Sequence, residues 1–547
     1  MEKTRKIRFL PLFVSPVLPC LFRVITTLCL FGLTGASSSV SEKDVELRVG
    51  IVQRFGAKIT DKMRLAPTNG DRIKLRFTQG NQQKTLTTAN PVQLETVMQK
   101  LSPPALQEIL VLGDFRTFET AEDSATKLRS QGIEVEIAQP ERWQVWAKRD
   151  VYSTPLLRRL LLQSLKASGQ DNGYLDTQIL KETPQLSWVV NNEAYKSDHL
   201  EITTDKNLIR VSVGKNLNQP RLYAGKMNLQ PNAYGTYTLV NQVLLETYLR
   251  GVLPYEIGTK APKSALEAQA IIARTYALQN VRRFDVDNYQ LCADTHCQVY
   301  QGLNEVSTST DQASADTKGM VLTYNNQLVD TLYSSTTGGV TAYFSDVWDG
   351  EDRPYLQPVV DAPTNIWNLS TQNLADENNF RQFINLRTGF NESGWNVFRW
   401  RKESKLEDII TDLQRFLTLK KSPYGKLKTV EAMSIVKRSQ SGRVLELAVK
   451  SDIGTFVLHK DEIRSAFRDP ISTLFYLEPL NKGQKNIWGY AFVGGGLGHG
   501  VGLSQTGAQN LAKLNWSSSK ILQFYYPGTQ VTMLSEKLKP LPTQNSK

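Results

Sequence analysis

The chain has 547 residues, which is too long for one ordinary hydrophobic core and predicts about two to four domains. Hydrophobic residues make up 40% and charged residues 22%, which excludes a wholly disordered chain, a collagen-like fibre and a multi-span membrane protein. Lys and Arg number 65 against 53 for Asp and Glu, but the resulting net charge of +12 is spread along the chain. Because no run of like charge marks a nucleic-acid-binding arm, we expect no nucleic-acid partner.

Residues 1–36 are typical of an export signal. A basic start precedes apolar stretches that end with Val24–Leu33, and the small residues Thr34–Ser37 follow, where a signal peptidase cuts. An uncleaved membrane anchor is the alternative, because residues 9–35 are long enough to span a bilayer. In either case we expect an exported protein of the periplasm or cell envelope, which touches the membrane only through this segment if it is retained.

Apolar periodicity predicts a mixed α+β chain with several domains. Residues 37–44 form a polar linker, residues 45–170 a small α/β region, and residues 536–547 a disordered tail. In the α/β region we expect strands at 47–52, 73–77, 108–113, 133–137 and 143–147, and helices at 119–131 and 154–167. Further along we expect strands at 209–213, 221–225, 237–245, 430–436, 445–449 and 455–458, and helices at 262–280, 404–419 and 517–526.

One carboxylate precedes the strong helix at 262–280. Glu256 lies in an expected loop among the apolar residues Leu253, Tyr255 and Ile257. Partial desolvation by such neighbours raises the pKa of a carboxyl group toward the value that a general acid needs near neutral pH. A solvated glutamate without a catalytic role is the alternative. The helix itself begins either with Pro262 in its first turn or with a capping box from Ser264.

Four blocks of sequence stand out, at residues 245–277, 298–302, 333–341 and 498–508. Together they resemble the SpoIID/LytB family. They occur in the family's order within residues 185–535, which we therefore expect to be a SpoIID/LytB domain, β-rich with packed helices. The first block joins Leu245–Glu256 to Ala265–Ala277, and the last departs from the family pattern by Leu503 in place of Met. The other blocks are Gln298-Val-Tyr-Gln-Gly302, Tyr333-Ser-Ser-Thr-Thr-Gly-Gly-Val-Thr341 and, last, Gly498-His-Gly-Val-Gly-Leu-Ser-Gln-Thr-Gly-Ala508.

The resemblance implies a lytic transglycosylase that cleaves MurNAc–GlcNAc strands of peptidoglycan, preferentially strands lacking stem peptides, with Glu256 as acid and then base. A glycoside hydrolase normally needs two carboxylates. Here one suffices, because the substrate's own muramic C6 hydroxyl is the tethered nucleophile. No cofactor is required. LytB-type relatives are described as amidase enhancers, so the alternative is a non-catalytic peptidoglycan-binding protein with cell-wall amidases as partners.

The same blocks supply candidate substrate-binding residues. Arg274 either orients Glu256 or binds substrate, or it has a plain surface role or forms a buried pair. His499 either contacts substrate or is a packed structural histidine. Neutral donors and acceptors suit glycan hydroxyls. The further candidates are Gln269, Tyr333, Ser334, Ser504 and Gln505.

Cys292 and Cys297 are the cysteines left once the signal is removed, out of four in the chain. Two cysteines five residues apart in an exported protein favour a disulfide-closed loop. Zinc is the second interpretation, with His296 as a third ligand, because some SpoIID proteins carry zinc near this place. The spacing is unlike that of a zinc finger, and no nearby upstream histidine offers a fourth ligand.

The strand–helix–strand unit at about 108–137 resembles a SPOR-like domain. The resemblance implies binding of peptidoglycan glycan stripped of stem peptides. An unrelated α/β unit is the alternative. The residues that carry the resemblance are Leu112, Gly113, Phe115, Ala121, Leu128 and Gly132.

Overall fold

A computed structural model describes residues 44–214, 217–482, 486–535 and 538. From Asp44 onward the chain forms one compact unit. The expected signal or anchor, most of the expected linker and nearly all of the expected tail lie outside the described residues. Within the described ranges, no helix is both long enough and apolar enough to cross a bilayer.

The first sheet has seven strands in the order β15-β1-β14-β13-β10-β3-β4. Its neighbours are antiparallel, except that β1 and β15 run parallel. Buried and exposed side chains alternate along β3, as expected for a strand with one face on a core. The strands are β1 (Glu46–Phe55), β3 (Ile73–Gln79), β4 (Gln82–Thr88), β10 (Leu200–Thr204), β13 (Lys226–Pro231), β14 (Tyr237–Leu244) and β15 (Leu291–Cys292).

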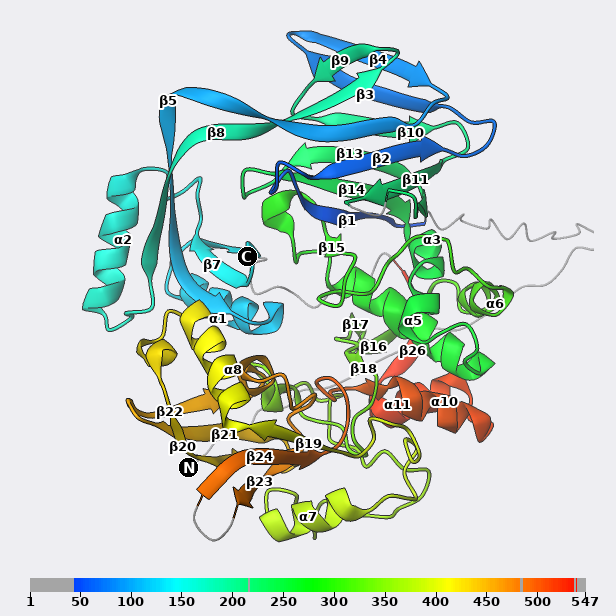
Figure 1. The fold of residues 1–547 in the computed structure, drawn as a ribbon. Helices are drawn as coiled ribbons and strands as arrows, with labels where there is room; N and C mark the ends of the chain where they lie inside the picture. The colour runs from blue at the N-terminus through cyan, green and yellow to red at the C-terminus, as the bar shows by residue number, and fades with distance from the viewer. Residues whose placement is uncertain (1–43, 215–216, 483–485, 536–537, 539–547) are drawn as a thin grey trace, which may run out of the picture. The chain divides into compact units, whose positions relative to one another are not determined.

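The second sheet follows the order β12-β11-β2-β5-β7-β6, and β8 pairs with both β5 and β9. The long strands β5 and β8 are paired from Leu94 to Val111. In Figure 1 they form a ribbon that leads from the sheets toward α1, α2 and β7. The strands are β2 (Lys62–Pro67), β5 (Val92–Phe115), β6 (Val135–Ala138), β7 (Trp143–Ala147), β8 (Tyr174–Val190), β9 (Glu193–Lys196), β11 (Leu208–Val213) and β12 (Arg221–Ala224).

Strands from the expected α/β region and from the expected SpoIID/LytB domain alternate in both sheets. β1 lies between β14 and β15, and β2 lies between β11 and β5. Apolar side chains of both sheets share one core with Tyr248, Leu249 and Ala273. Residues 45–170 and residues from 185 onward therefore fold together.

Two helices follow β5 and β7, close to their expected positions. α1 (Phe118–Ser130) is capped by Thr117 and buries Ala121, Ala125 and Leu128, as its apolar periodicity predicts. α2 (Pro155–Ala167) is capped by Thr154. Trp143 of β7 and Phe118 of α1 are in edge contact, and Trp143 also contacts Phe284 beyond α5.

The segment that carries Glu256 is helical, where the sequence led us to expect a loop. α3 (Leu245–Arg250) is followed by α4 (Leu253–Glu256), and α5 (Lys263–Gln279) comes next. α5 begins after Pro262, which takes the N-cap position without a side-chain hydrogen bond. Of the two expected starts, the capping box from Ser264 is therefore wrong, and Pro262 lies directly before the first turn rather than in it. α5 is buried on almost every side, because small and apolar residues surround its axis and neighbouring helices pack closely.

The remaining elements build the C-terminal part of the chain. The expected strands near 430–458 form one sheet, and the expected helix at 404–419 begins at Leu406 because β19 precedes it. The mixed α+β fold class is confirmed. These elements are η1 (Asp285–Asp287), α6 (Thr308–Asp316), β16 (Met320–Tyr324), β17 (Gln327–Leu328), β18 (Tyr333–Ser334), η2 (Phe344–Asp346), α7 (Glu377–Asn385), β19 (Trp400–Lys405), α8 (Leu406–Leu419), η3 (Pro423–Lys426), β20 (Val430–Arg438), β21 (Val444–Ser451), β22 (Gly454–His459), α9 (Glu462–Ala466), β23 (Phe475–Lys482), β24 (Asn486–Gly494), β25 (Leu503–Ser504), α10 (Gln505–Lys513), α11 (Ser518–Tyr525) and β26 (Gln530–Met533).

Candidate active site

Glu256 lies half-buried at the end of α4, and donors from three other segments point at its carboxyl group. The backbone N–H of Val299 donates to Oε1 at 2.7 Å. The side-chain amide of Gln505 donates to Oε2 at 3.4 Å. The hydroxyl of Tyr333 also hydrogen-bonds this carboxyl group. Residues from all four resembling blocks therefore meet at one acidic side chain.

Burial raises the pKa of Glu256 above its ordinary value. The hydrogen bonds from Val299, Tyr333 and Gln505 act in the opposite direction, because they favour the ionised form, but burial has the larger effect. A carboxyl group in this situation keeps its proton at a higher pH than an exposed glutamate. It can also accept a proton back, because three donors stand ready to stabilise the anion.

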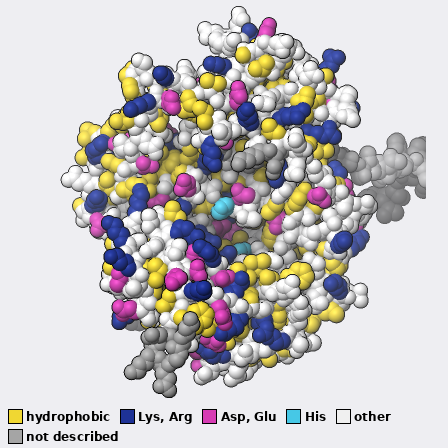
Figure 2. Space-filling view, in the orientation of Figure 1, with side chains coloured by type: hydrophobic (Ala, Val, Ile, Leu, Met, Phe, Trp, Pro, Cys, Tyr) yellow, Lys and Arg dark blue, Asp and Glu magenta, His cyan; other side chains and the backbone are white. Residues whose placement is uncertain are grey.

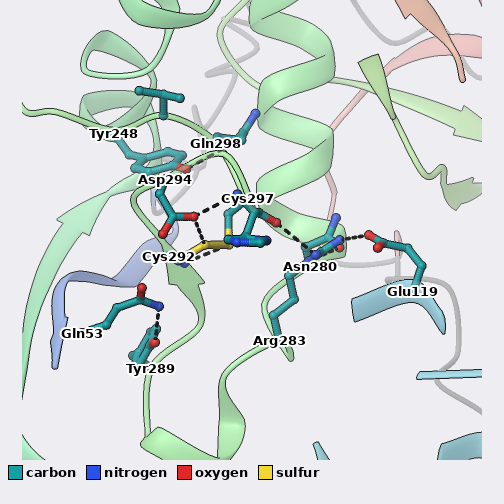
Figure 3. Close-up of a disulfide and its surroundings, with 12 residues drawn as sticks. Gln53, Glu119, Tyr248, Asn280, Arg283, Tyr289, Cys292, Asp294, Cys297 and Gln298 are labelled. Carbon is teal, nitrogen blue, oxygen red and sulfur yellow. Dashed lines mark hydrogen bonds and ion pairs between the residues drawn. A yellow bond between two sulfur atoms is a disulfide. The ribbon is translucent and has the colours of Figure 1, made fainter. Parts of the chain in front are cut away.

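A disulfide between Cys292 and Cys297 closes the loop that precedes Val299. The two Cα atoms are 5.6 Å apart, and the loop is tied further by a hydrogen bond from the N–H of Tyr300 to the carbonyl of Ala293. Figure 3 shows the disulfide beside Asp294 and Gln298. The disulfide interpretation is confirmed, and it gives the Val299 amide a fixed approach to Glu256.

The residues at this loop do not fit a zinc ion. Zinc binds thiolates, and the sulfur atoms of Cys292 and Cys297 are bonded to each other. The side chain of His296 is exposed, and its backbone carbonyl accepts a hydrogen bond from Arg283. No group of three metal-binding side chains occurs in the part of the chain that the structure describes.

Tyr333 and Gln505 are brought to Glu256 by a short parallel pairing of β18 with β25. Tyr333 pairs with Leu503, and Ser334 pairs with Ser504. Ser504 is the N-cap of α10, because its hydroxyl accepts the N–H of Gly507 at 3.0 Å. Gln505 is thus the first residue of the helix, and its position follows from the pairing and the cap.

His499 lies near this pairing, with its ring 5.0 Å from that of Trp348. Its Nδ1 accepts the N–H of Val501 at 3.0 Å, and it is also hydrogen-bonded to the backbone of Tyr333. Burial, reinforced by the charges of Arg464 and Arg443, lowers the pKa of His499 to about 3. The imidazole is therefore neutral near pH 7. Figure 2 shows histidine side chains near the middle of one face of the molecule.

Arg274 lies elsewhere. Its guanidinium group is fully buried and forms a two-pronged ion pair with Glu246, with both N–O distances 2.7 Å. It also donates to the carbonyl of Met320 at 3.0 Å. The buried-pair alternative therefore describes Arg274, and the role of orienting Glu256 or binding substrate does not, because its donors point to other partners.

The other candidates divide between the site and its support. Gln269 is fully buried on α5; its Oε1 accepts from Gln505 at 3.5 Å, and its Nε2 has no partner among the described residues. Ser504 is buried too, and its hydroxyl donates to Glu392. Ser334 is buried, and its hydroxyl contacts the carbonyl of Thr336 at 3.5 Å. Because both serines are buried, we expect them to stabilise the backbone around the site rather than to contact substrate.

The helix of the SPOR-like unit is joined to the segment that follows α5. Glu119 and Glu122 of α1 form ion pairs with Arg283 and Arg282. Arg283 also donates to the carbonyl of His296 in the disulfide loop. Figure 3 shows Glu119, Arg283 and the disulfide loop together. The resemblance to SPOR domains stays a prediction.

Two family models match parts of this chain. A family model described as stage II sporulation protein, SpoIID, matches residues 233–324, which carry Glu256, Gln269 and Val299. A second, described as a domain of unknown function (DUF8618), matches residues 342–502. Residues 233–324 are thus similar to the SpoIID family. The SpoIID match covers the segment from β14 to β16 and so includes the acid and two of the blocks around it.

Three related proteins match different shares of this chain. The amidase enhancer of Bacillus subtilis (strain 168) is 29% identical over 300 residues, which are 52% of this chain and 40% of that protein. An uncharacterized protein of Brachyspira hyodysenteriae is 26% identical, over 63% of this chain and 81% of its own. Stage II sporulation protein D of Bacillus subtilis (strain 168) is 25% identical, over 56% and 81%. The chain thus matches less than half the length of the amidase enhancer.

Sequence reasoning missed two contributors to the site. Val299 contributes its backbone N–H, and a backbone contact cannot be predicted from the residue type, although Val299 lies in the block Gln298–Gly302. Glu392 lies in a stretch without a recognisable pattern, yet its carboxylate is fully buried and bound to Ser504. A single glutamate among polar residues carries no signal of burial, so only the fold could reveal it.

Proposed function

We propose that the protein is an exported lytic transglycosylase that cleaves MurNAc–GlcNAc strands of peptidoglycan, with Glu256 as acid and then base. One observation carries the proposal: a half-buried carboxyl group with a raised pKa receives hydrogen bonds from Val299, Tyr333 and Gln505. Glycan lacking stem peptides is the preferred substrate in this proposal. The site of action is the cell envelope.

The reaction needs one proton to move out and one to move back. Glu256 gives its proton to the glycosidic oxygen while the bond from that oxygen to the muramic C1 breaks. The C6 hydroxyl of the same muramic residue then bonds to C1, and its proton passes to the Glu256 carboxylate. The products are a 1,6-anhydro end and a free hydroxyl on the leaving sugar, and water takes no part. The tethered hydroxyl replaces the second carboxylate of a hydrolase.

The donors around Glu256 suit both halves of this cycle. In the first half the raised pKa keeps the proton on the acid. In the second half the amide of Val299 and the hydroxyl of Tyr333 stabilise the anion until the C6 hydroxyl returns a proton. Gln505 donates to both Glu256 and Gln269, which links the carboxyl group to the buried amide of α5.

Mass spectrometry of digested glycan tests the proposal. The protein should convert glycan without stem peptides into fragments with anhydro ends, and E256Q should release none. E305Q is the matched control, because Glu305 is an exposed glutamate in the same domain. Equal product from E256Q and wild type would remove Glu256 from the mechanism, and hydrolysed rather than anhydro ends would remove the C6 hydroxyl.

A non-catalytic role as an amidase enhancer is the second candidate. It rests on the match to the protein of that name, which spans 300 residues. In that case the protein binds peptidoglycan and stimulates cell-wall amidases without cleaving glycan. Amidase assays with wild type and E256Q separate the two: equal stimulation by both, with no glycan fragments from either, favours this candidate.

A further inference from the structure

The buried carboxylate of Glu392 joins two of the segments that serve Glu256. Its Oε1 accepts the N–H of Thr337 at 2.6 Å and the hydroxyl of Thr337 at 3.0 Å. Its Oε2 accepts the N–H groups of Gly338 and Gly339 at 2.8 and 3.1 Å. The hydroxyl of Ser504 donates to Oε1 at 2.6 Å. Both oxygens act only as acceptors here, as an ionised carboxylate does.

The turn that holds Glu392 requires its two glycines. Gly338 and Gly339 have φ angles of 75° and 89°, and successive N–H groups in such a turn converge on one anion. A Cβ at Gly338 would stand 2.7 Å from the backbone of Gly495. From the other side, Arg399 donates to the carbonyl of Gly338 at 2.8 Å and Arg443 to that of Thr337 at 2.7 Å. The turn is therefore fixed on both sides.

Asp361 completes the buried cluster. It accepts the hydroxyl of Tyr525 at 2.7 Å and the side-chain amide of Asn391 at 2.8 Å. It is also hydrogen-bonded to Glu392, and burial together with the charge of Glu392 raises the pKa of Asp361 well above its ordinary value. The two carboxyl groups are thus coupled within one buried cluster, which also contains the turn and the Ser504 hydroxyl.

We propose that Glu392 is a positioning residue for Glu256. It fixes the turn at 337–339 to the N-cap of α10, so that Tyr333 and Gln505 reach the Glu256 carboxyl group together. The link is short on both sides: Tyr333 and Ser334 lie just before the turn and pair with Leu503 and Ser504. Gln505 follows the capping serine directly. This inference rests on the proposed function of Glu256.

E392Q changes the shape of the side chain very little. It breaks the link because the amide N–H₂ group of glutamine would face the N–H groups of the turn, which are also donors. We expect kcat for glycan cleavage to fall at least about tenfold while KM stays within about twofold. We also expect the alkaline limb of the pH–rate profile to move to higher pH. Weaker hydrogen bonds from Tyr333 and Gln505 leave the anion of Glu256 less stabilised and raise its pKa further.

E108Q is the matched control. Glu108 is another buried glutamate; it lies on β5 and is held by Arg158 and Arg159 of α2. Its loss should lower thermal stability without moving the pH–rate profile. A second pair isolates the capping link: S504A should reproduce the effect of E392Q on the profile, and S504T, which keeps the hydroxyl, should restore it. Wild-type kcat and an unmoved profile in folded E392Q would overturn the proposal.

Hydrogen exchange of the full chain separates this inference from the function of Glu256. In E392Q the amides of 333–339 and 503–507 should exchange faster than in wild type, and in E108Q they should not. This measurement needs no substrate. Unchanged exchange in both segments overturns the positioning role even if wild type cleaves glycan. Faster exchange supports the link between the segments even if no anhydro product appears. The absence of anhydro product would instead reject the proposed function.

Discussion

The backbone N–H of Val299 donates to Glu256 two residues after Cys297, the second cysteine of the disulfide. The same short segment places Gln298, whose side chain donates to the hydroxyl of Tyr333 at 3.3 Å. A covalent loop and the acidic group are therefore in direct structural contact, and several measurable properties depend on this arrangement.

Removing the disulfide should cost both stability and activity. The double variant C292S/C297S should unfold about 2 kcal/mol more easily, which is the chain-entropy estimate for so short a loop. Its glycan cleavage should also fall, because the Val299 amide loses its fixed approach to Glu256. Denaturant unfolding with and without reductant measures the first effect. Reductant should act on wild type and leave the double variant unchanged; an effect of equal size on both would reject this explanation.

The raised pKa of Glu256 predicts the shape of the pH–rate profile. An acid works only while protonated, so activity should decline as pH rises through the pKa of Glu256, which lies above its ordinary value because of burial. A profile whose alkaline limb lies at the pH of an ordinary exposed glutamate would contradict this expectation.

The same shift predicts that E256Q is more stable than wild type near neutral pH. A carboxyl group whose folded pKa is raised stabilises the fold below its unfolded pKa, and this contribution is lost as pH rises through the folded pKa. Glutamine carries no charge, so the loss does not occur. Thermal unfolding of both proteins between pH 4 and pH 8 should give curves that diverge as pH rises, with E256Q the more stable. Parallel curves would argue against burial of this carboxyl group.

Arg274 should matter for folding rather than for chemistry. Replacing it with Ala leaves Glu246 without its buried partner and should cost about 3–5 kcal/mol of unfolding free energy. Glycan cleavage per folded molecule should remain close to wild type. The measurement is denaturant unfolding together with activity corrected for the folded fraction. A large fall in kcat at full folding would return Arg274 to the catalytic residues.

His499 should stay neutral throughout the working range. Its pKa of about 3 predicts that its imidazole signals in an NMR titration do not move between pH 5 and pH 8. Comparison with H499Q identifies which signals belong to it. A midpoint near pH 6.5 would show that the ring is open to solvent, and a proton-transfer role would then need a new account.

The sequence predicted local features well and distant ones poorly. The burial of Ala121, Ala125 and Leu128 on α1 follows from helical periodicity alone. The pairing of β1 with β14 could not be predicted, because their hydrophobic patterns fit many partners and the two strands are separated by most of the first half of the chain. Local patterns specify elements, whereas sheet order depends on which pairings the whole core allows.

The same division applies to the site. The order of the family blocks identified Glu256, and cysteine spacing favoured the disulfide over zinc. The role of Glu392 was invisible, because burial of a charged side chain depends on a turn near residue 338 and a helix cap at residue 504 that lie far away in the sequence. Arg274 shows the opposite case. As a charged residue near the Glu256 motif it was a reasonable candidate, yet its guanidinium group is paired with Glu246 on α3.

The alternation of β1 and β2 with later strands has a practical consequence for the design of truncated forms of the protein. A fragment beginning at residue 185 would keep β10, β11, β13 and β14 but discard the strands between and beside them. Open strand edges and an uncovered apolar layer would result, which favours insoluble aggregates over a folded protein. Expression plasmids for this protein should therefore begin no later than Asp44.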